Sequence, residues 1–231
     1  MAKLFWDDDG HKIYETGVKR GVLSVWDDTN NAYGVPVAWN GLTGVTQSPS
    51  GAEATALYAD DIKYLELVSN EDFGCTIEAY QSPEEFDECD GSATVVTGVK
   101  ISGQKRKRFC FSYVTTVGND QLGNDYGYKI HLIYGARAGV SERAYATIND
   151  SPEAMTLSWE VTTTPIPVDD YNAEHNTDFK PVAHLEINST TVDSAKLTAF
   201  ENILYGTNGS GNTEGTAPHF PTPQEVFAAF A

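Results

Sequence analysis

The sequence predicts a mainly β protein with one short helix beside the strands and one helix near the C-terminus. Apolar and polar residues alternate along many segments, and turn-forming residues separate these segments. Only two segments combine a helix start signal with a glycine that ends the helix. The chain has 231 residues, which is enough for one large β domain with its own core.

Strands are predicted where side chains alternate between a face that packs on the core and a face that is exposed to solvent. The clearest case places Met155, Leu157, Trp159 and Val161 on one side and hydroxyl or acidic residues on the other. The same pattern predicts strands at residues 18–26, 35–39, 42–46, 62–68, 73–80, 109–117 and 128–134. The Asn40-Gly41 pair predicts a type I′ hairpin turn, because both residue types tolerate positive φ.

The two predicted helices have different signals. Ser82-Pro83-Glu84-Glu85 has the form of a capping box, and Gly91 ends that short helix. The second helix covers residues 193–205, with Asp193 as N-cap and Gly206 as terminator. The residues that follow are rich in Gly, Asn, Thr and Pro. We therefore expect a β domain at residues 1–205 and an extended C-terminal arm at residues 206–231.

The longest stretch without a clear pattern in the first part of the chain covers residues 47–61. A loop of this length inside a compact domain is uncommon and is usually functional, disordered or ordered by a partner. We interpret it as a loop that a partner orders.

The chain is strongly acidic, with 15 Lys and Arg against 33 Asp and Glu, a formal net charge of -18. Proteins that hold DNA without reading its sequence need basic side chains, so this charge argues against DNA binding. The three cysteines, Cys75, Cys89 and Cys110, lie in or beside apolar patterns and are expected to be reduced core residues. With neither a signal peptide nor a membrane span in the sequence, we expect synthesis in the cytoplasm and no membrane partner.

The sequence offers little catalytic chemistry. It has no nucleophile elbow and no phosphate-binding lysine loop, and its five histidines lack ligand spacing. The acidic runs at residues 7–9 and 27–28 lack the EF-hand pattern and are interpreted as turns. We expect no enzyme activity, no catalytic residue, no cofactor and no metal site.

Several segments of the chain together carry a family resemblance. They are Lys3-Leu4-Phe5-Trp6-Asp7, Tyr14-Glu15-Thr16-Gly17-Val18, Trp39-Asn40-Gly41-Leu42-Thr43, Ser48-Pro49-Ser50-Gly51-Ala52-Glu53, Leu57-Tyr58-Ala59-Asp60, Thr76-Ile77-Glu78-Ala79-Tyr80 through Glu85-Phe86, Tyr126-Gly127-Tyr128-Lys129, Leu132-Ile133-Tyr134-Gly135-Ala136 and Trp159-Glu160-Val161-Thr162-Thr163-Thr164-Pro165. In their number and order these segments resemble the major tail proteins of siphophages that infect Gram-positive bacteria. They span about the first three quarters of the chain. The chain departs from the family in a polar insertion at residues 169–178 and in a long segment at residues 206–223.

The resemblance implies a β-sandwich or barrel-like tail-tube fold in a virion subunit that forms stacked hexameric rings. The implied partners are other copies of the chain, a tape-measure protein in the lumen, and tail terminator and distal tail proteins at the ends. Double-stranded DNA would pass through during ejection without specific binding. A second hypothesis is a soluble β-sandwich module that binds a carbohydrate or receptor, which an exposed aromatic platform of Trp26, Trp39 and Tyr58 would favour.

Two sets of residues follow as candidates for these roles. The candidate assembly residues are Ser48, Pro49, Glu53, Tyr58, Asp60, Asp61, Lys105, Arg106, Lys107 and Arg108. The run 105–108 is interpreted first as a solvated strand end, and the alternative is an ion-pairing contact to an acidic neighbouring subunit. The candidate lumen residues are Glu66, Glu78 and Glu160, which lie at the polar phase of predicted strands.

Overall fold

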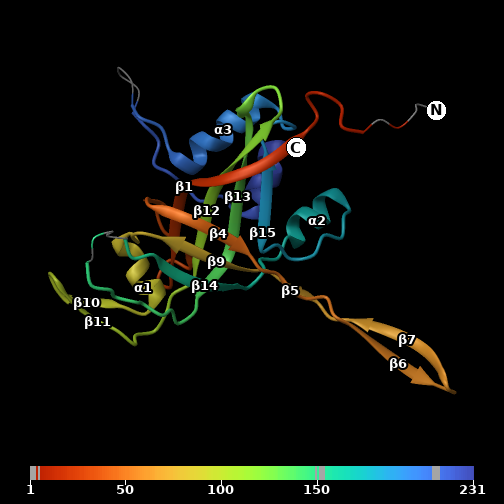
Figure 1. Cartoon of the computed structure of the whole chain (residues 1–231), viewed down its shortest axis with the longest axis horizontal. Coiled ribbons are helices and arrows are strands. Elements are labelled where there is room, and N and C mark those ends of the chain that lie inside the picture. The colour runs from red at the N-terminus through yellow and green to blue at the C-terminus, as the bar shows by residue number, and fades with distance from the viewer. Residues whose placement is uncertain (1–3, 5, 149, 151–153, 210–213) are drawn as a thin grey trace.

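The fold is a large antiparallel sheet with helices on its outer side and at one end (Figure 1). The computed structural model describes residues 4, 6–148, 150, 154–209 and 214–231. Lys3 and Phe5 of the family resemblance lie outside the described residues. The predicted mainly β class is confirmed, as are the short flanking helix and a helix near the C-terminus.

The main sheet has nine strands in the order β2-β1-β12-β13-β14-β9-β4, with β3 paired to β1 and β15 paired to β13. Their bounds are β1 (Ile13–Asp27), β2 (Ala32–Tyr33), β3 (Val37–Trp39), β4 (Leu42–Gln47), β9 (Gly74–Ala79), β12 (Phe109–Asn119), β13 (Gly123–Ala138), β14 (Leu157–Thr163) and β15 (His184–Asn188). Three two-stranded pairs lie apart from it: β5 (Ser50–Gly51) with β8 (Glu71–Asp72), β6 (Ala54–Ala59) with β7 (Ile62–Val68), and β10 (Ala93–Val96) with β11 (Val99–Ile101).

The sheet curls back on itself through the Asn40-Gly41 corner. Trp39 in β3 pairs with Gly21 at one end of the strand order, whereas Leu42 in β4 pairs with Ala79 at the other end. The predicted type I′ hairpin is therefore wrong, because β3 and β4 pair with different strands. The Gly41 carbonyl accepts from Tyr80 N at 2.8 Å, which ties the corner to β9. The corner joins the two ends of the sheet into a barrel-like curl.

The inner core fills the concave side of this curl. Trp159 packs edge-on against Trp39 with 5.5 Å between ring centroids, and Phe86 approaches Trp159 at 5.0 Å. Trp39 is 2% exposed and donates its indole N–H to the Gln81 carbonyl at 2.8 Å. Because Phe86 belongs to the short helical segment, that segment closes one end of the core. Cys75 and Cys89 are buried in this core, and Cys110 is buried in the core on the opposite side of the sheet. All three are free thiols, so the prediction of reduced core cysteines is confirmed.

An outer core lies on the convex side of β12 and β13. Ile130 and Leu132 of β13 pack there with Leu197 and Phe200 of the long helix and with Val226 of the last helix. The hairpin β12–β13 is thus apolar on both faces, the pattern of a sheet covered on both sides. The helices are η1 (Glu84–Phe86), α1 (Asp87–Asp90), α2 (Asp169–His175), α3 (Ser194–Tyr205) and α4 (Pro223–Phe230).

The second predicted helix is confirmed, and the first differs in its start. Asp193 caps α3 by accepting from the backbone N–H groups of Ala195 and Lys196, both at 3.0 Å. Gly91 ends α1 with a left-handed φ of 85°. The predicted capping box of Ser82 does not form, because Pro83 occupies the N-cap and the segment opens as a 3-10 turn without a side-chain cap.

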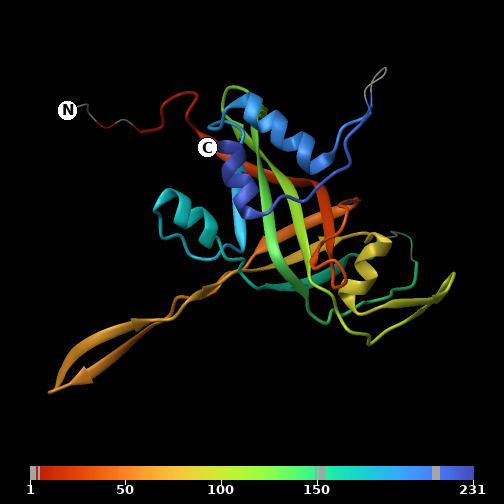
Figure 2. The ribbon, with the colours of Figure 1, turned by 180° about the vertical axis from the view of Figure 1, so that it is seen from behind.

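The predicted extended arm at residues 206–231 is wrong for its second half. Thr222 and Glu225 form a capping box that starts α4. Phe220 is buried in the outer core, and the Tyr134 hydroxyl donates to the Pro221 carbonyl at 3.0 Å. Burial of apolar side chains on β13 holds this segment against the body. Figure 2 shows the last helix beside the sheet from behind. Among the helices of the described chain, none has the length and apolar character needed to cross a membrane.

The predicted loop at residues 47–61 is also wrong, because these residues form the first half of a long projecting hairpin (Figure 1). Ala54 pairs with Val68 and Ala59 with Ile62. Asp60 and Asp61 form the turn with φ of 51° and 62°, the positive values that a type I′ hairpin requires. We call residues 48–73 the arm.

Candidate assembly surfaces

The arm carries the largest group of exposed apolar side chains on one element of the protein. All seven residues of β7 are exposed, and the aromatic rings Tyr58 and Tyr64 are 73% and 69% exposed. The exposed apolar residues of the arm are Leu57, Tyr58, Ile62, Tyr64, Leu65, Leu67 and Val68. An isolated two-stranded hairpin is marginally stable in water, and exposed apolar patches of this kind mark interaction sites. The arm is therefore a candidate contact surface.

Both faces of the arm are apolar. Residues directly opposite on the two strands share a face, so Leu57 and Leu65 lie on one side with Leu67. Tyr64, Glu66 and Val68 follow one another at intervals of two residues, so they share the other side of the arm. The first strand of the arm, β6, has no alternation of apolar and polar residues, whereas the strand predicted at residues 62–68 from its period-two pattern is confirmed as β7.

The arm is also acidic. Residues 48–73 hold six carboxylates and a single cation, Lys63. Lys63 bonds to Glu66 at 2.5 Å, and both side chains are exposed, so the pair adds little to stability. The carboxylates are Glu53, Asp60, Asp61, Glu66, Glu71 and Asp72.

Six of the ten candidate assembly residues lie on the arm. Ser48 and Pro49 stand at its base, where Ser48 N donates to the Gly74 carbonyl at 2.8 Å. Glu53 lies along its length, where its carbonyl accepts from Ser69 N at 3.1 Å, and Tyr58, Asp60 and Asp61 lie at its tip. The structure thus gathers these six on one projecting element.

The other four candidates form the basic run at residues 105–108, which enters β12. Lys107 bonds to Glu88 at 2.5 Å, and this hydrogen bond raises the pKa of Lys107. Arg106 donates to the Ala138 carbonyl at 3.0 Å, and the Arg108 guanidinium lies 4.3 Å from the centroid of the Trp26 ring. Lys105 is the freest, with a side chain 89% exposed and its nearest carboxylate, Asp28, at 3.9 Å.

The hairpin β10–β11 precedes this run and forms a second exposed apolar element. Its four exposed apolar side chains are Val95, Val96, Val99 and Ile101. Like the arm, it makes a two-stranded sheet separate from the main sheet. The hairpin and the run together cover residues 93–108, which we call the basic segment.

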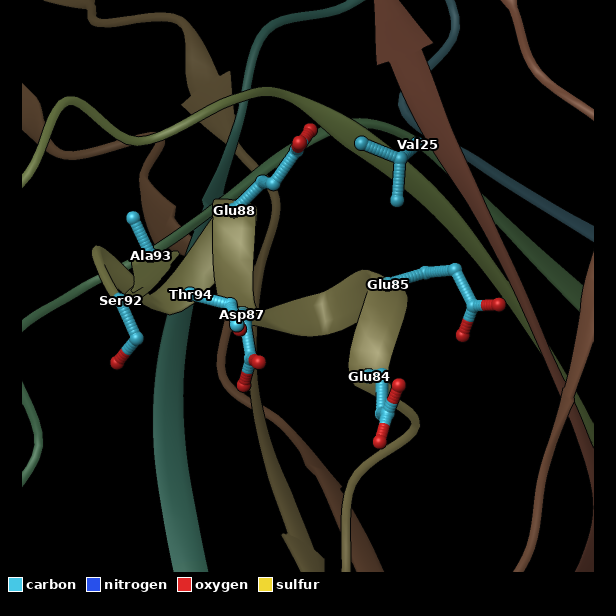
Figure 3. A pocket seen from close by; sticks show the side chains of 8 residues that line it. All are labelled: Val25, Glu84, Glu85, Asp87, Glu88, Ser92, Ala93 and Thr94. Carbon is cyan, nitrogen blue, oxygen red and sulfur yellow. The ribbon is translucent and has the colours of Figure 1, made fainter. Parts of the chain in front are cut away.

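An acidic pocket lies between the basic segment and the first strand (Figure 3). Glu84, Glu85, Asp87 and Glu88 line it together with Val25 and the start of β10. Asp87 bonds to Lys100 and Glu88 to Lys107 at its rim. These two lysines are therefore already paired within the subunit. Within the described residues, no group of three His, Cys, Asp or Glu side chains has the arrangement of a metal site.

Two of the three candidate lumen residues share a face. In the β4–β9–β14 part of the sheet, Ile77 and Trp159 point into the inner core, and the residues beside them point outward. Glu78 pairs with Ser158, and Glu160 pairs with Thr76, so the outward face carries carboxylates and hydroxyls. Glu66 does not belong to this face, because it lies on the arm.

The aromatic platform expected for a binding module does not form. Trp39 is buried in the inner core. Trp26 packs edge-on against Tyr33 with 4.9 Å between centroids and also contacts Arg108. Tyr58 stands on the arm, apart from both.

A column of stacked rings fills the polar end of the curled sheet. Phe73 stacks on His184 at 4.7 Å, and His131 stacks on Tyr113 at 4.6 Å. The two histidine rings lie 5.4 Å apart, with His131 Nδ1 and His184 Nε2 at 3.2 Å. His131 Nε2 also bonds to the Thr115 hydroxyl at 3.0 Å. The stacking of His131 on His184 is not predictable from the local sequence, because the partner lies 53 residues further along the chain.

Burial sets the protonation of this column. It lowers the pKa of His131, and burial together with the repulsion that a protonated His131 would exert lowers the pKa of His184 to about 4. Glu15, Lys129 and Glu186 surround the pair, and Lys129 bonds to both carboxylates at 2.9 Å. The hydrogen bonds that Lys129 donates to these carboxylates, to Glu15 first, raise the pKa of Lys129. The folded protein therefore holds neutral imidazoles beside a charged cluster.

The depressed histidine pKa predicts a loss of stability in mild acid. The unfolded chain binds protons on His184 from its ordinary pKa of 6.5 downward, whereas the folded chain does so only near 4. The contribution is thus full above pH 6.5 and is lost as the pH falls towards 4. Urea unfolding between these pH values should show a smaller loss in His184→Gln than in the wild type. The exposed His175→Gln serves as control, and an unchanged pH slope in His184→Gln would contradict the prediction.

Comparisons with known proteins give weak structural likenesses to several solved chains, two of which are described here. No family model matches the chain, and no curated protein matches it. A chain of the six-fold symmetrised baseplate of the anti-feeding prophage gives a TM-score of 0.35 at 8% identity, over 73% of this chain and 92% of that chain. A chain of the extended sheath–tube complex of the PVC extracellular contractile injection system gives 0.28 at 14%, over 63% and 84%. Both TM-scores are too low to carry an argument about fold or function.

Proposed function

We propose that the chain is a structural, non-enzymatic subunit of a long-tailed bacteriophage tail, and specifically the siphophage tail-tube protein. The observation that carries the proposal is the arm, an ordered hairpin that projects from the body with apolar side chains on both faces. The sequence resemblance to siphophage major tail proteins supports it independently. The chain then acts through its shape and its contacts.

A second copy of the chain is the partner that fits the arm. A hairpin with two apolar faces gains stability when another subunit covers them, since buried apolar surface contributes about 25 cal/mol per Å². In a ring or a stack of rings every subunit receives such a cover, because a heterologous contact repeats from copy to copy. Hexameric rings stacked into a tube are the arrangement that the resemblance implies.

The outward face of β4, β9 and β14 is our candidate lining of the lumen. Sixfold repetition would turn Glu78 and Glu160 into rings of like charge. Such rings repel phosphates, so DNA would pass during ejection without binding. The overall charge of -18 agrees with this role.

The remaining partners and the location follow from the same proposal. The lumen would hold a tape-measure protein before ejection, and terminator and distal tail proteins would close the ends. The protein would be synthesised in the host cytoplasm and function in the virion. Because Trp26, Trp39 and Tyr58 form no common platform, the binding-module hypothesis has no comparable support.

Electron microscopy of the purified chain tests the proposal. We expect rings or tubes at high protein concentration, together with a particle mass that rises with concentration in light scattering. The chain should also be a major component of tails from virions that encode it. A monomer at every concentration, absent from virion tails, would overturn the proposal.

The lumen assignment makes a separate prediction. Glu78→Lys and Glu160→Lys should each assemble but slow DNA ejection, most at low salt, where screening is weakest. The reason is that a ring of cations would hold the phosphates that a ring of carboxylates repels. Ejection is measured by release of a dye-bound genome from virions carrying each variant. Glu174→Lys on α2 is the matched control, and wild-type ejection rates in both lumen variants at all salt concentrations would disprove the assignment.

A further inference from the structure

We infer that the arm of one copy docks on the basic segment of the next copy, in a head-to-tail contact. This inference rests on the proposed function and adds the identity of the receiving surface. It draws on charge, apolar surface and placement, which are independent features of the structure.

The charges of the two elements are complementary. The basic segment holds five cations and no carboxylate, although the whole chain has only 15 Lys and Arg. The arm holds six carboxylates and one cation. Complementary charge steers association and fixes which surfaces meet. In a protein with a net charge of -18, the basic segment is the densest cationic surface that an acidic arm of another copy could meet.

The cations of the basic segment without a close ion pair inside the subunit include Lys105 and Arg106. Lys100 and Lys107 are bonded to Asp87 and Glu88 of α1. Lys105 points into solvent, and Arg106 bonds to a backbone carbonyl rather than to a carboxylate. These last two are the residues that we assign to the contact between copies.

Apolar surface is present on both sides of the proposed contact. Val95, Val96 and Val99 are exposed on the basic segment, as Tyr58 and Tyr64 are on the arm. Both elements are two-stranded sheets outside the main sheet, so their outer strand edges are open to pairing. Contact between the arm and the basic segment would bury the apolar side chains of both and would allow backbone hydrogen bonds between their outer strands.

The placement of the two elements requires the contact to be between copies. The arm and β10–β11 lie at opposite ends of the longest axis of the molecule, and both views show this separation (Figures 1 and 2). No copy can dock its own arm on its own basic segment. Each copy therefore offers one arm and one receiving surface, which is the arrangement that propagates from subunit to subunit.

Charge reversal with rescue tests the pairing. Glu53→Lys/Glu66→Lys on the arm and Lys105→Glu/Arg106→Glu on the basic segment should each weaken self-association about tenfold. Mixing the two variants should restore association, since a cationic arm then meets an anionic receiver. Asp170→Lys/Glu174→Lys on α2 is the matched control and should associate as the wild type does. Association is measured by sedimentation at fixed salt.

Cross-linking tests the geometry directly. The native thiols are buried, so Lys63→Cys on the arm and Thr97→Cys in the β10–β11 turn can be labelled selectively. A mixture of the two variants should give a cross-linked dimer with a short bismaleimide, whereas Lys63→Cys mixed with Asp178→Cys should not.

The outcomes separate the two proposals. Tubes that form normally, with no rescue by mixing and no cross-link from 63 to 97, would overturn the docking inference and leave the proposed function standing. A wild-type chain that never associates would overturn the proposed function itself.

Discussion

Replacing Tyr58, Tyr64 and Leu67 together with threonine is expected to abolish tube formation and to leave thermal stability unchanged. All three side chains are exposed in the subunit, so their removal opens no core. Threonine keeps the preference for the strand. If each side chain is buried at a contact, its loss costs about 1.5 to 3 kcal/mol, and the three together weaken the contact about a thousandfold or more. Light scattering and circular dichroism measure the two properties.

A matched variant isolates the role of the arm in that experiment. Val35 and Leu122 are also exposed apolar residues, but they lie on the body. Val35→Thr/Leu122→Thr should form tubes at the wild-type concentration. Normal tubes from the arm variant would show that the arm is not the contact surface.

The largest expected effect on stability comes from Trp159→Ala. Trp159 is 0% exposed and touches Trp39 and Phe86, so the substitution leaves a cavity where two rings lose their partner. Removal of a buried tryptophan costs about 3 to 5 kcal/mol. We expect the urea midpoint to fall accordingly with an unchanged slope.

Trp159→Phe separates volume from hydrogen bonding at the same position. The indole N–H of Trp159 is buried and has no hydrogen-bond partner among the described residues. Phenylalanine removes this unpaired donor and keeps an aromatic ring in the core, so its cost should be well below that of alanine. Equal losses for the two variants would show that packing of the ring does not dominate.

The fold was predictable where one face of a strand packs and the other meets water. In β14 buried residues such as Trp159 alternate with residues on the outward face such as Glu160, and this period-two pattern predicted the strand. Asp193 and Gly206 predicted the ends of α3, because only a few residue types satisfy the unpaired backbone groups at the two ends of a helix. These signals are local, so the sequence alone contains them.

Other elements were missed because a distant or absent partner decides them. The first strand of the arm has no alternation, since neither of its faces packs on the body. Gly41 looks like a hairpin residue, but pairing of Leu42 with Ala79 in β9 overrides the local turn preference. The capping box at Thr222 that starts α4 was missed, because the Gly, Asn, Thr and Pro content of the preceding residues led to the interpretation of an extended arm.

The candidate surfaces were predicted in part for the same reason. The residues from Ser48 to Asp61 became candidates because they show no helix or strand pattern. Six of the candidate assembly residues lie together on the arm. The candidate lumen residues follow from strand phase alone. Phase places Glu78 and Glu160 on one face, but it cannot show that Glu66 belongs to a separate hairpin.

The hairpin β12–β13 belongs to both cores, and this sharing has a consequence for unfolding. Phe111 and Ile133 face the inner core, whereas Ile130 and Leu132 face the helices. Neither layer can open without uncovering the strand that supports the other. The body should therefore melt in one cooperative step, and its slowest-exchanging amides should lie in β12 and β13. The arm makes no such double contact, so its amides should exchange by local opening well before the body unfolds.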